Sequence, residues 1–438
     1  MEYLIKSKSI LLKIRMQIYC LIIFILLKNR FIGILFQSIQ MDSLFDILIN
    51  FYKNCLLLRK DLALSLSFTM APTLIDSASL ENWPFKLERP IIIAGPCGVE
   101  SEEQISTTAF ELSKLNIQLL RGGIWKPRTR PDSFQGIGNE GLHWLKQAGV
   151  KYNLPVTVEV ANPKHVEQAL KEKIDVLWIG ARTTVNPFLV QEIADSLKGV
   201  DIPVMVKNPI NPELELWIGA FERLNRSGIS KLMAIHRGFS VFGESKYRNA
   251  PKWEIPIELR RRFPNLPLIC DPSHIAGVSS LIPQLSQNAL DLNYDGLMIE
   301  THIHPEQALS DRDQQLTPIQ LKEILNDLIV RKASVDDVIF LNLLEELRDK
   351  IDLIDERILI LMAERMSVAR EIGQYKKENN MTILQVERWN EILKSRSQSA
   401  KLKELSLDFI FRFYELIHEE SIRHQTEVMQ DVKANTSS

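Results

Sequence analysis

Short apolar runs alternate with amphipathic stretches of helical length from residue 88 to residue 331, and this alternation restricts the possible folds most. Several of the longer stretches open with helix-start signals: Ser101 precedes two acids, and Asn-Pro pairs stand at 162–163 and 186–187. Eight such strand–helix units predict an α/β fold, a closed parallel (β/α)8 or TIM barrel. An open doubly wound sheet is the alternative, but the sequence lacks the glycine fingerprint of a dinucleotide-binding sheet. The expected strands are Ile91–Ala94, Gln118–Leu120, Val156–Val160, Val176–Ile179, Val204–Val206, Leu232–Ile235, Leu268–Cys270 and Gly296–Ile299.

A polar or reactive side chain follows each expected strand within a few residues. In a parallel barrel these ends meet at one rim, which is where such barrels hold their active sites. Charge at one strand end has an ordinary structural explanation, but stability does not require it at all eight. In chain order the residues are Cys97, Arg121, Lys126, Glu159, Arg182, Lys207, Arg237, Asp271, His274 and Glu300.

Two chemical groups can be separated on this rim. The cations suit phosphate and carboxylate groups; they are Arg121, Lys126, Arg182, Lys207 and Arg237. A thiol, an imidazole and carboxylates suit a divalent transition metal with one position left open; they are Cys97, His274, Glu300 and Asp311. Each of these four residues alone would be interpreted as structural. Their common position on one rim favours the interpretation that they are metal ligands. We interpret His302 and His304 as structural and Cys270 as a core residue.

The loop after the second expected strand is strongly cationic. Residues 119–130 read LLRGGIWKPRTR and contain four cations and no acid. Two glycines and a proline allow a sharp turn. The alternative is a solvated basic loop, but its place directly after a strand favours a site for an anionic substrate, most often a phosphate.

The composition is that of a globular protein, with 45% apolar and 25% charged residues among 438. The formal charge of −2 gives no general attraction to nucleic acid, so any anion binding is local. Four scattered cysteines form neither a zinc pattern nor a disulfide framework, which favours a reducing cytoplasm.

Residues 1–69 differ from the rest, being rich in Leu, Ile, Phe and Lys. The longest uncharged run, Met16–Leu27, is shorter than the ~20 residues of a spanning helix. A signal peptide and a membrane tether are both alternatives. We favour a start at Met70, with the upstream extension absent from the mature protein.

The strand-end motifs resemble the smaller form of 3-deoxy-D-arabino-heptulosonate 7-phosphate (DAHP) synthase from about Pro84 to Lys332. The matching motifs are GPCG (95–98), LRGGIWKPRT (120–129), GAR (180–182), KNP (207–209), HRG (236–238), DPSH (271–274), IETH (299–302) and LSDRDQQL (309–316).

This resemblance implies a metal-dependent, aldol-type condensation of phosphoenolpyruvate with erythrose 4-phosphate at the start of aromatic amino-acid biosynthesis. It implies that Mn, Fe, Co or Zn is held by Cys97, His274, Glu300 and Asp311. It implies that phosphoenolpyruvate is held by Arg121, Lys126, Arg182, Lys207 and Arg237, with Glu159 and Asp271 also at the substrate. Lys126 would transfer a proton, and the sugar phosphate would meet Pro127, Arg128 and Thr129.

Two departures affect the expected phosphate contacts. Gly98-Val99 stand where the family usually has Ser-Ala, and Arg130 stands where it usually has Ser. The competing enzyme is 3-deoxy-octulosonate 8-phosphate synthase, whose loop usually reads Lys-Ala-Asn. Lys126-Pro127-Arg128 therefore favours the four-carbon acceptor.

From Leu341 the apolar period becomes helical and continues to Ile372 without a proline. One helix over 340–377 would be roughly 55 Å long and is expected to pack against a partner chain. Shorter helices are expected over Gln385–Ser397 and Ser406–Met429, so this part is all-α. A plain dimerising bundle is the alternative interpretation.

The polar residues of this part resemble the all-helical chorismate mutase, from Leu341 to about Met429. The matching stretches are LRDKIDLIDERILILMAERMSVAREIGQYK, VER (386–388) and HEESIRHQ (418–425). The resemblance implies rearrangement of chorismate to prephenate, with Arg365, Arg388 and a partner chain's Arg348 binding carboxylates and hydroxyl. Lys376 and Gln425 would face the ether oxygen, and Ser421 would add a contact. Gln385 replaces the acid that often binds the substrate hydroxyl.

The expected organisation is a barrel over 80–331, a linker over 332–339, a helical domain over 340–430 and a disordered tail over 431–438. We expect a bifunctional homodimer in which prephenate or chorismate slows the synthase. The alternative is an octulosonate-type barrel with a helical module that only dimerises or regulates.

Overall fold

The computed structural model describes residues 75–126, 132–243, 245–332, 334 and 337–430. Its contacts divide the chain into two compact units, one ending at Val330 and one beginning at Arg331. The expectations for residues 1–69, for Pro127, Arg128, Thr129 and Arg130, and for the tail fall outside the described residues. Each unit is described below by itself.

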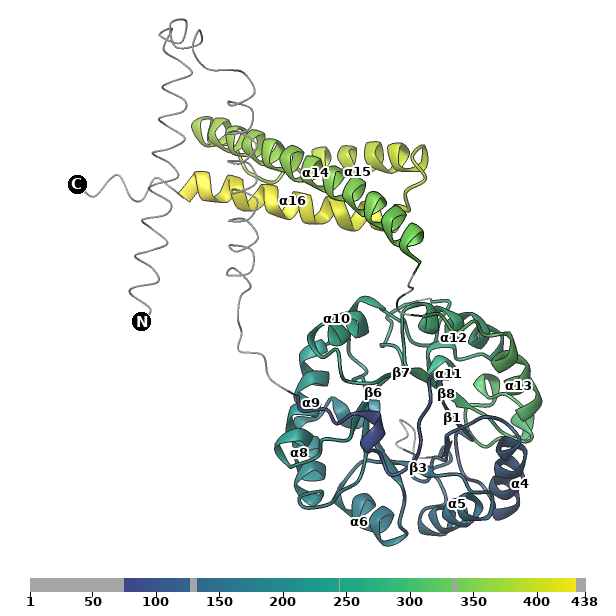
Figure 1. The fold of residues 1–438 in the computed structure, drawn as a ribbon. Helices are drawn as coiled ribbons and strands as arrows, with labels where there is room; N and C mark the ends of the chain where they lie inside the picture. Colours follow the sequence, from purple (N-terminus) through teal and green to yellow (C-terminus); the bar gives the residue numbers. More distant parts are fainter. Residues whose placement is uncertain (1–74, 127–131, 244, 333, 335–336, 431–438) are drawn as a thin grey trace, which may run out of the picture. The chain divides into compact units, whose positions relative to one another are not determined.

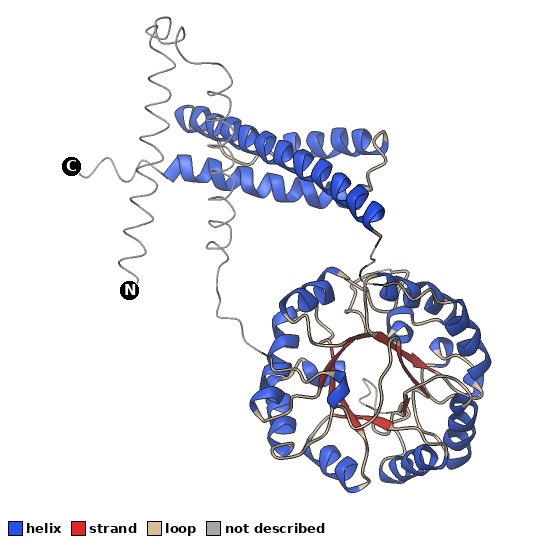
Figure 2. Ribbon diagram, viewed as in Figure 1, coloured by secondary structure: helices blue, strands red, loops and turns tan. Residues whose placement is uncertain are grey.

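The first unit is a closed barrel in which every strand is parallel to its neighbours (Figures 1 and 2). The strands run in chain order around the barrel, and β1 closes it by pairing with β8. All eight expected strands are confirmed. Their sequences are apolar runs because strands of a closed parallel barrel are covered on both faces. The strands are β1 (Ile91–Gly95), β2 (Leu119–Arg121), β3 (Val156–Val160), β4 (Val176–Ile179), β5 (Val204–Lys207), β6 (Leu232–His236), β7 (Leu268–Cys270) and β8 (Gly296–Glu300).

Helices cover the outside of the barrel (Figure 2). The predicted start signals are confirmed: the side chains of Ser101, Asn162 and Asn186 each accept a hydrogen bond from the first turn of their helix. The helices are α4 (Glu102–Ser113), α5 (Asn139–Lys151), α6 (Pro163–Lys171), α7 (Ala181–Thr184), α8 (Pro187–Ser196), α9 (Leu214–Arg226), α10 (Glu254–Arg262), α11 (Pro272–Ala276), α12 (Ile282–Asp291) and α13 (Pro318–Asp327), with short 3-10 turns η1 (Leu80–Asn82), η2 (Ser279–Leu281), η3 (Pro305–Gln307) and η4 (Arg312–Gln314).

The barrel has two hydrophobic cores, because alternate strand residues point inward and outward. The outer core lies between strands and helices and includes Cys270, as expected. The inner core fills the barrel with side chains such as Trp178 and Met298. Trp83 belongs to this inner core, so the segment around η1 packs against the barrel interior. The barrel is therefore filled, and its functional groups are confined to the rim.

The second unit is a three-helix arrangement (Figure 1). It consists of α14 (Val338–Glu378), α15 (Val386–Lys401) and α16 (Leu407–Gln430), and the three predicted helices are confirmed to within a few residues. Asp337 caps α14 by accepting hydrogen bonds from the backbone of Ile339 and Phe340. A Cβ on Gly373 would lie 3.1 Å from the Cα of Gln425, so this glycine permits the close approach of α14 and α16. None of the helices among the described residues is long and apolar enough to cross a membrane.

Candidate active sites

Three of the four predicted metal ligands lie together at the rim of the barrel. Ligand atoms of Cys97, Glu300 and Asp311 are all within 4.8 Å of one another. Strand register brings two of them close, because Gly95 of β1 pairs with Glu300 of β8 and Cys97 follows two residues later. The Sγ of Cys97 is 3.1 Å from Oδ2 of Asp311. A soft sulfur donor beside two carboxylates is a donor set that fits a divalent transition metal.

His274, the fourth predicted ligand, lies beside this group rather than within it. It stands on α11, a short helix after β7, and its Nε2 is 3.8 Å from Oε1 of Glu300. Its Nδ1 is 2.8 Å from Oδ2 of Asp271, which fixes the ring and leaves Nε2 facing Glu300. A carboxylate that accepts a hydrogen bond from the other ring nitrogen commonly orients a metal-binding histidine in this way.

The protonation of these groups differs according to their neighbours. Burial, reinforced by the charge of Glu300, raises the pKa of the Cys97 thiol to about 12. Burial alone would also raise the pKa of Glu300, but His274 and Arg121 hold it below its usual value. Asp311 behaves likewise, because Arg248 outweighs its partial burial. Without a metal, these pKa shifts favour a protonated thiol beside two ionised carboxylates.

A cavity of about 560 Å³ opens beside the cluster. Its size is ordinary for a small-molecule site. Cations outnumber acids on its walls, so it is suited to an anionic substrate. It is lined by Lys126, Ser133, Glu159, Ala181, Arg182, Lys207, Ile210, Arg237, Ser240, Arg248, Asn249, His274 and Asp311.

Arg121 lies at the base of this site with unused hydrogen-bonding capacity. It is 2% exposed, and its Nη2 is 3.0 Å from Oε1 of Glu300. Its Nε and Nη1 are buried and have no hydrogen-bond partner among the described residues. Buried polar atoms are rarely left unpaired, so two free donors here indicate a site for an anionic ligand.

Two lysines also lie at the rim. The Nζ of Lys126 is 2.8 Å from Sγ of Cys97 and 2.5 Å from its carbonyl oxygen. A Cβ on Gly123 would lie 2.7 Å from that Nζ, so the glycine allows the loop to fold over the thiol. The Nζ of Lys207 is 2.7 Å from Oδ2 of Asp271. Asp271 is fully buried and also contacts Nδ1 of His274, so one carboxylate fixes both side chains.

The remaining predicted residues of the barrel also line the cavity. Glu159 accepts a hydrogen bond from Nε1 of Trp178 at 3.2 Å. Arg182 lies on α7, directly after β4. Arg237 donates from Nη1 to Asn249 at 2.7 Å. Most of the described barrel residues predicted for the site line this cavity. The others do not line it: Cys97, Asp271 and Glu300 contact residues that do, and Arg121 contacts Glu300.

The helical unit has a cavity of its own, of about 660 Å³. Six of the seven predicted mutase residues line it: Arg365, Lys376, Gln385, Arg388, Ser421 and Gln425. No acid lines it within the described part of the chain, and four cations do. Arg365 donates from Nη1 to Oγ of Ser421 at 2.5 Å. Oε1 of Gln425 is buried without a hydrogen-bond partner among the described residues.

Arg348 is the predicted residue that this cavity does not contain. It lies on the exposed first half of α14, where its Nη1 is 2.5 Å from Oε1 of Glu345. Its position within one chain is compatible with the expectation that it serves another subunit's site, which remains a prediction.

Sequence reasoning missed several residues of both sites. Arg248 and Asn249 line the barrel cavity but stand in the long connection between β6 and α10, away from any strand end. In the helical cavity, Arg396 was missed although it stands eight residues after Arg388, a spacing that repeats a helix face. Trp389 and His418, also missed, stack with ring centroids 4.1 Å apart.

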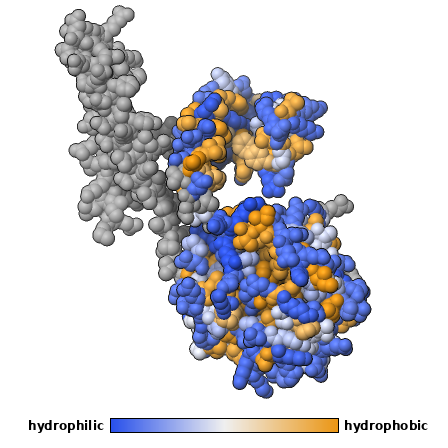
Figure 3. Space-filling model, turned by 45° about the vertical axis from the view of Figure 1, so that its right-hand side comes forward, coloured by the Kyte–Doolittle hydropathy of each residue, from blue (hydrophilic) through white to orange (hydrophobic). Residues whose placement is uncertain are grey.

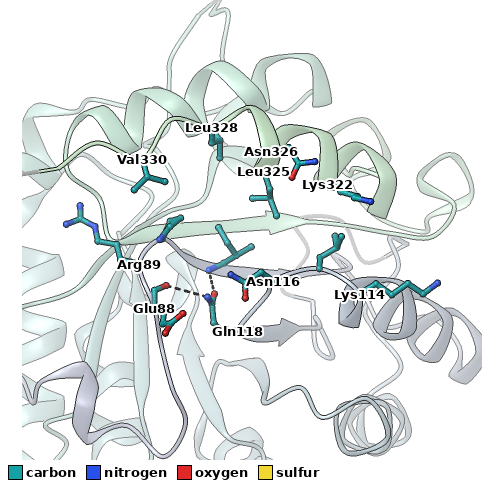
Figure 4. Close-up of a pocket in the computed structure, with 13 residues that line it drawn as sticks. Glu88, Arg89, Lys114, Asn116, Gln118, Lys322, Leu325, Asn326, Leu328 and Val330 are labelled. Atoms are coloured by element: carbon teal, nitrogen blue, oxygen red, sulfur yellow. Dashed lines mark hydrogen bonds between the residues drawn. The ribbon is translucent and has the colours of Figure 1, made fainter.

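A further barrel cavity of about 330 Å³ lies far from this chemistry (Figure 4). It is bounded by the residues that enter β1 and β2 and by α13, at the opposite ends of the strands from the rim. The side chain of Gln118 bridges two of its walls, accepting from Ile92 N and donating to Glu88 O.

Comparison with known proteins bears on both units. The sequence model of the DAHP synthetase I family matches residues 86–333. The chain belongs to the DAHP synthetase I family. The chorismate mutase type II model matches residues 347–426. The two domains support both enzyme activities, and together they support a bifunctional role in the shikimate pathway, in aromatic amino-acid biosynthesis.

Individual relatives agree with this family. A phospho-2-dehydro-3-deoxyheptonate aldolase of Thermotoga maritima is 35% identical over 237 residues, which are 54% of this chain and 68% of that protein. A 2-dehydro-3-deoxyphosphooctonate aldolase of Paraburkholderia xenovorans is 29% identical over 60% of this chain and 98% of its own length. The crystal structure of the Thermotoga maritima DAHP synthase superposes with a TM-score of 0.52 at 33% identity, covering 57% of this chain and 72% of that one.

Proposed function

We propose that the barrel of this DAHP synthetase I family member condenses phosphoenolpyruvate with erythrose 4-phosphate in a metal-dependent reaction. The observation that carries this proposal is the position of the two unpaired Arg121 nitrogens beside the Cys97, Glu300 and Asp311 donors. An anion held by Arg121 would thus lie next to a metal held by those donors and His274. The family relationship supports the reaction type.

The chain's own residues have distinct tasks in this scheme. Arg121, Lys207 and the cavity cations bind the phosphate and carboxylate of phosphoenolpyruvate. The bound metal would supply Lewis-acid polarisation of the aldehyde oxygen. Lys126 would give a proton to that oxygen as the methylene carbon of phosphoenolpyruvate forms the new carbon–carbon bond. Water then adds to the carbon that bears the phosphate ester, and phosphate leaves.

The sugar acceptor is proposed from the loop chemistry. Relatives named for both a heptonate and an octonate product match this chain, so the family likeness does not choose between the two acceptors. The Lys126-Pro127-Arg128 sequence favours erythrose 4-phosphate over a five-carbon sugar phosphate. The expected contacts of the sugar phosphate with Pro127, Arg128 and Thr129 lie outside the described residues.

The test is a product assay with both acceptors. Purified full-length protein, supplied with phosphoenolpyruvate and either erythrose 4-phosphate or arabinose 5-phosphate, should form the seven-carbon product at least ~10-fold faster. Mass spectrometry identifies the product. Preferential formation of the eight-carbon product would establish the octulosonate alternative instead.

We propose that the helical unit rearranges chorismate to prephenate. Arg365 and Arg388 line its cavity and are suited to bind carboxylates. Lys376 and Gln425 line the same cavity. Burial lowers the pKa of Lys376, whose Nζ now donates to the carbonyl of Ile383 at 2.5 Å. Catalysis would come from holding the compact substrate and stabilising charge on the ether oxygen.

Two neighbouring lysines make a matched test of the mutase site. Lys376→Met should lower kcat/KM for chorismate by ~100-fold or more, since one electrostatic donor at a transition state is worth about that. Lys377→Met removes the same charge from a lysine that binds Val428 O and does not line the cavity. Equal activity of the two variants would favour the interpretation of a non-catalytic dimerising module.

We also propose a homodimer through the helical unit. Apolar residues stand on its surface among polar ones (Figure 3). Along the first half of α14, four apolar side chains are about half exposed or more: Ile339, Leu347, Ile351 and Ile354. Exposed apolar patches of this kind mark protein interfaces. A second copy would cover them and could supply Arg348 to the neighbouring cavity.

Regulation and compartment complete the proposal. Prephenate or chorismate bound in the helical cavity is proposed to slow the synthase; the idea fails if prephenate changes neither the synthase rate nor the scattering profile.

A reducing cytoplasm is the proposed compartment, because the described cysteines, Cys97 and Cys270, are both free thiols.

A further inference from the structure

We propose that Arg248 is a positioning residue that holds the metal-binding carboxylates of the barrel in place. The inference rests on the proposed metal site. Arg248 stands in the connection between β6 and α10, and neither motif nor strand end marked it in the sequence.

One guanidinium nitrogen of Arg248 reaches two partners. Its Nη1 is 2.9 Å from Oδ1 of Asp311 and 2.6 Å from Oε1 of Gln314. The contact with Asp311 occupies the oxygen that faces away from Cys97. Oδ2 of the same carboxylate is thereby left toward Cys97 Sγ, at 3.1 Å.

The second partner extends the contact to Glu300. Gln314 is 1% exposed, and its Nε2 donates to Oε2 of Glu300 at 2.7 Å. The other oxygen, Oε1, is left toward Arg121 and His274. Each carboxylate therefore has one oxygen fixed from behind and one oxygen presented to the cluster, and Arg248 stands at the origin of both chains of contacts.

The backbone of the same segment is fixed to the helix that carries His274. Arg248 N donates to Ala276 O at 3.2 Å, Asn249 N donates to Ile275 O at 3.2 Å, and Asn249 Nδ2 donates to His274 O at 2.6 Å. Gly277 ends this helix with a φ of +75°, and a Cβ there would lie 2.5 Å from that of Arg248. This segment thus connects three of the four ligands.

Asp311 has a conformation that requires such support. It adopts the left-handed backbone region with a φ of 50°, which costs a non-glycine residue free energy and persists where surroundings impose it. Arg248 itself is half-exposed, so an isolated ion pair with Asp311 would contribute little to stability. We expect Arg248 to contribute to metal affinity instead, because loss of a residue that orients metal ligands typically lowers that affinity by ~10–100-fold.

For Arg248→Met, loss of the charge and loss of the positioning contacts predict opposite changes in metal affinity. A cation near a divalent metal repels it, so removing the charge alone would tighten metal binding. Removing a residue that positions the ligands would weaken metal binding. Lys246 is an exposed cation that lines a separate surface cavity of about 490 Å³, to which Arg248, Asp311 and Gln314 also belong. The hydrogen bonds and ion pairs that the structure describes include none between Lys246 and Asp311 or Gln314. Lys246→Met is therefore the control for the loss of charge.

The test is a Co²⁺ titration of the metal-free, full-length protein. Absorbance from thiolate-to-cobalt charge transfer reports ligation by Cys97, and competition with a chelator gives the Kd. Arg248→Met should raise the Kd by ~10–100-fold, and Arg248→Lys, which keeps one charged nitrogen, should recover part of the loss. Lys246→Met should leave the Kd within about twofold or lower it.

Gln314→Met, nearly isosteric, interrupts only the chain to Glu300 and should raise the Kd less than Arg248→Met. Adding it to Arg248→Met should have little further effect, because both act through one path. A Kd for Arg248→Met equal to or below that of the wild type would overturn the inference. If Arg248→Met does not fold, an unchanged Kd in Gln314→Met overturns it. Absence of the thiolate band in the wild type would instead refute the metal site itself.

Discussion

At the level of single residues, the reactive side chains of the barrel rim are held by side chains from the connections around them, as Arg248 and Gln314 hold Asp311 and Glu300. Strand ends predict a rim position for Cys97 or Glu300 without any knowledge of the rest of the fold. Arg248 lies in a connection whose path depends on tertiary contacts, so no local pattern marks it; Gln314 lies inside the LSDRDQQL motif, but only the structure shows its contact with Arg248. His274 also illustrates this limit: its residue type suggested a ligand, but only the structure shows Asp271 orienting it.

His236, at the end of β6, gives a prediction about pH and stability. It is fully buried as a neutral ring: Nε2 lies 2.6 Å from Pro251 O, and Nδ1 lies 3.0 Å from the Tyr294 hydroxyl. Burial lowers its pKa from 6.5 to about 3. Below pH 6.5 the unfolded chain therefore takes up a proton that the folded protein refuses. The free energy of unfolding should fall by up to about 1.4 kcal/mol per pH unit from this residue alone.

Urea unfolding at pH 6.5, 5.5 and 4.5 measures this contribution. His236→Gln keeps an amide donor but cannot titrate, so its free energy of unfolding should fall less steeply by about that amount per pH unit. The other histidines titrate in both proteins and cancel in the comparison. Parallel slopes for the two proteins would show that His236 is protonated in the folded state too.

At the scale of elements, apolar period and helix-start chemistry were sufficient for the regular structure. The strands are buried on both faces, which makes each a continuous apolar run that the sequence displays directly. The one-turn helices α7 and α11 were not predicted, because elements this short depend on tertiary contacts more than on propensity. α11, for example, is held by Asp271, whose side chain accepts from His274 N. These two short helices carry Arg182 and His274.

The long helix α14 gives the second prediction. Ile351, Ile354 and Ile358 recur at helical spacing, and each is at least 44% exposed within one chain. Ile354→Glu should therefore weaken the dimer by ~100-fold, because an unpaired charge at a buried interface costs about 3 kcal/mol. Light scattering over a concentration series measures the dissociation.

The matching control is Asp352→Lys, which also changes charge on α14 but about half a turn away from Ile354. It should leave the dimer intact. Mutase activity should fall with dimer content in Ile354→Glu if Arg348 acts in a neighbouring cavity. A fully dimeric Ile354→Glu protein would place the interface on another surface.

At the scale of the whole molecule, the sequence indicated two activities on one chain, and both families match in the expected order. Each candidate cavity is lined by residues of one unit alone. The chemistry of each unit should therefore survive loss of the other. What the sequence alone could not supply is the path of the long connections, which decides how each site is supported.

Independence of the two sites is the third prediction. Cys97→Ala should lower synthase turnover by ~100-fold or more while leaving mutase kcat within about twofold, since substitutions without shared partners act separately. Steady-state assays of both activities on one preparation measure this. Loss of mutase activity in Cys97→Ala would show that the helical unit requires an intact barrel cluster.

In the proposed reaction, the synthase needs a metal held by Cys97, His274, Glu300 and Asp311. The most direct measurement is the rate of phosphoenolpyruvate consumption with erythrose 4-phosphate, before and after chelator treatment and after addition of Mn²⁺ or Co²⁺. The account predicts that chelated protein loses activity ~100-fold or more and regains it with about one metal per barrel, whereas Cys97→Ala does not. Full-speed turnover by the metal-free protein would contradict it.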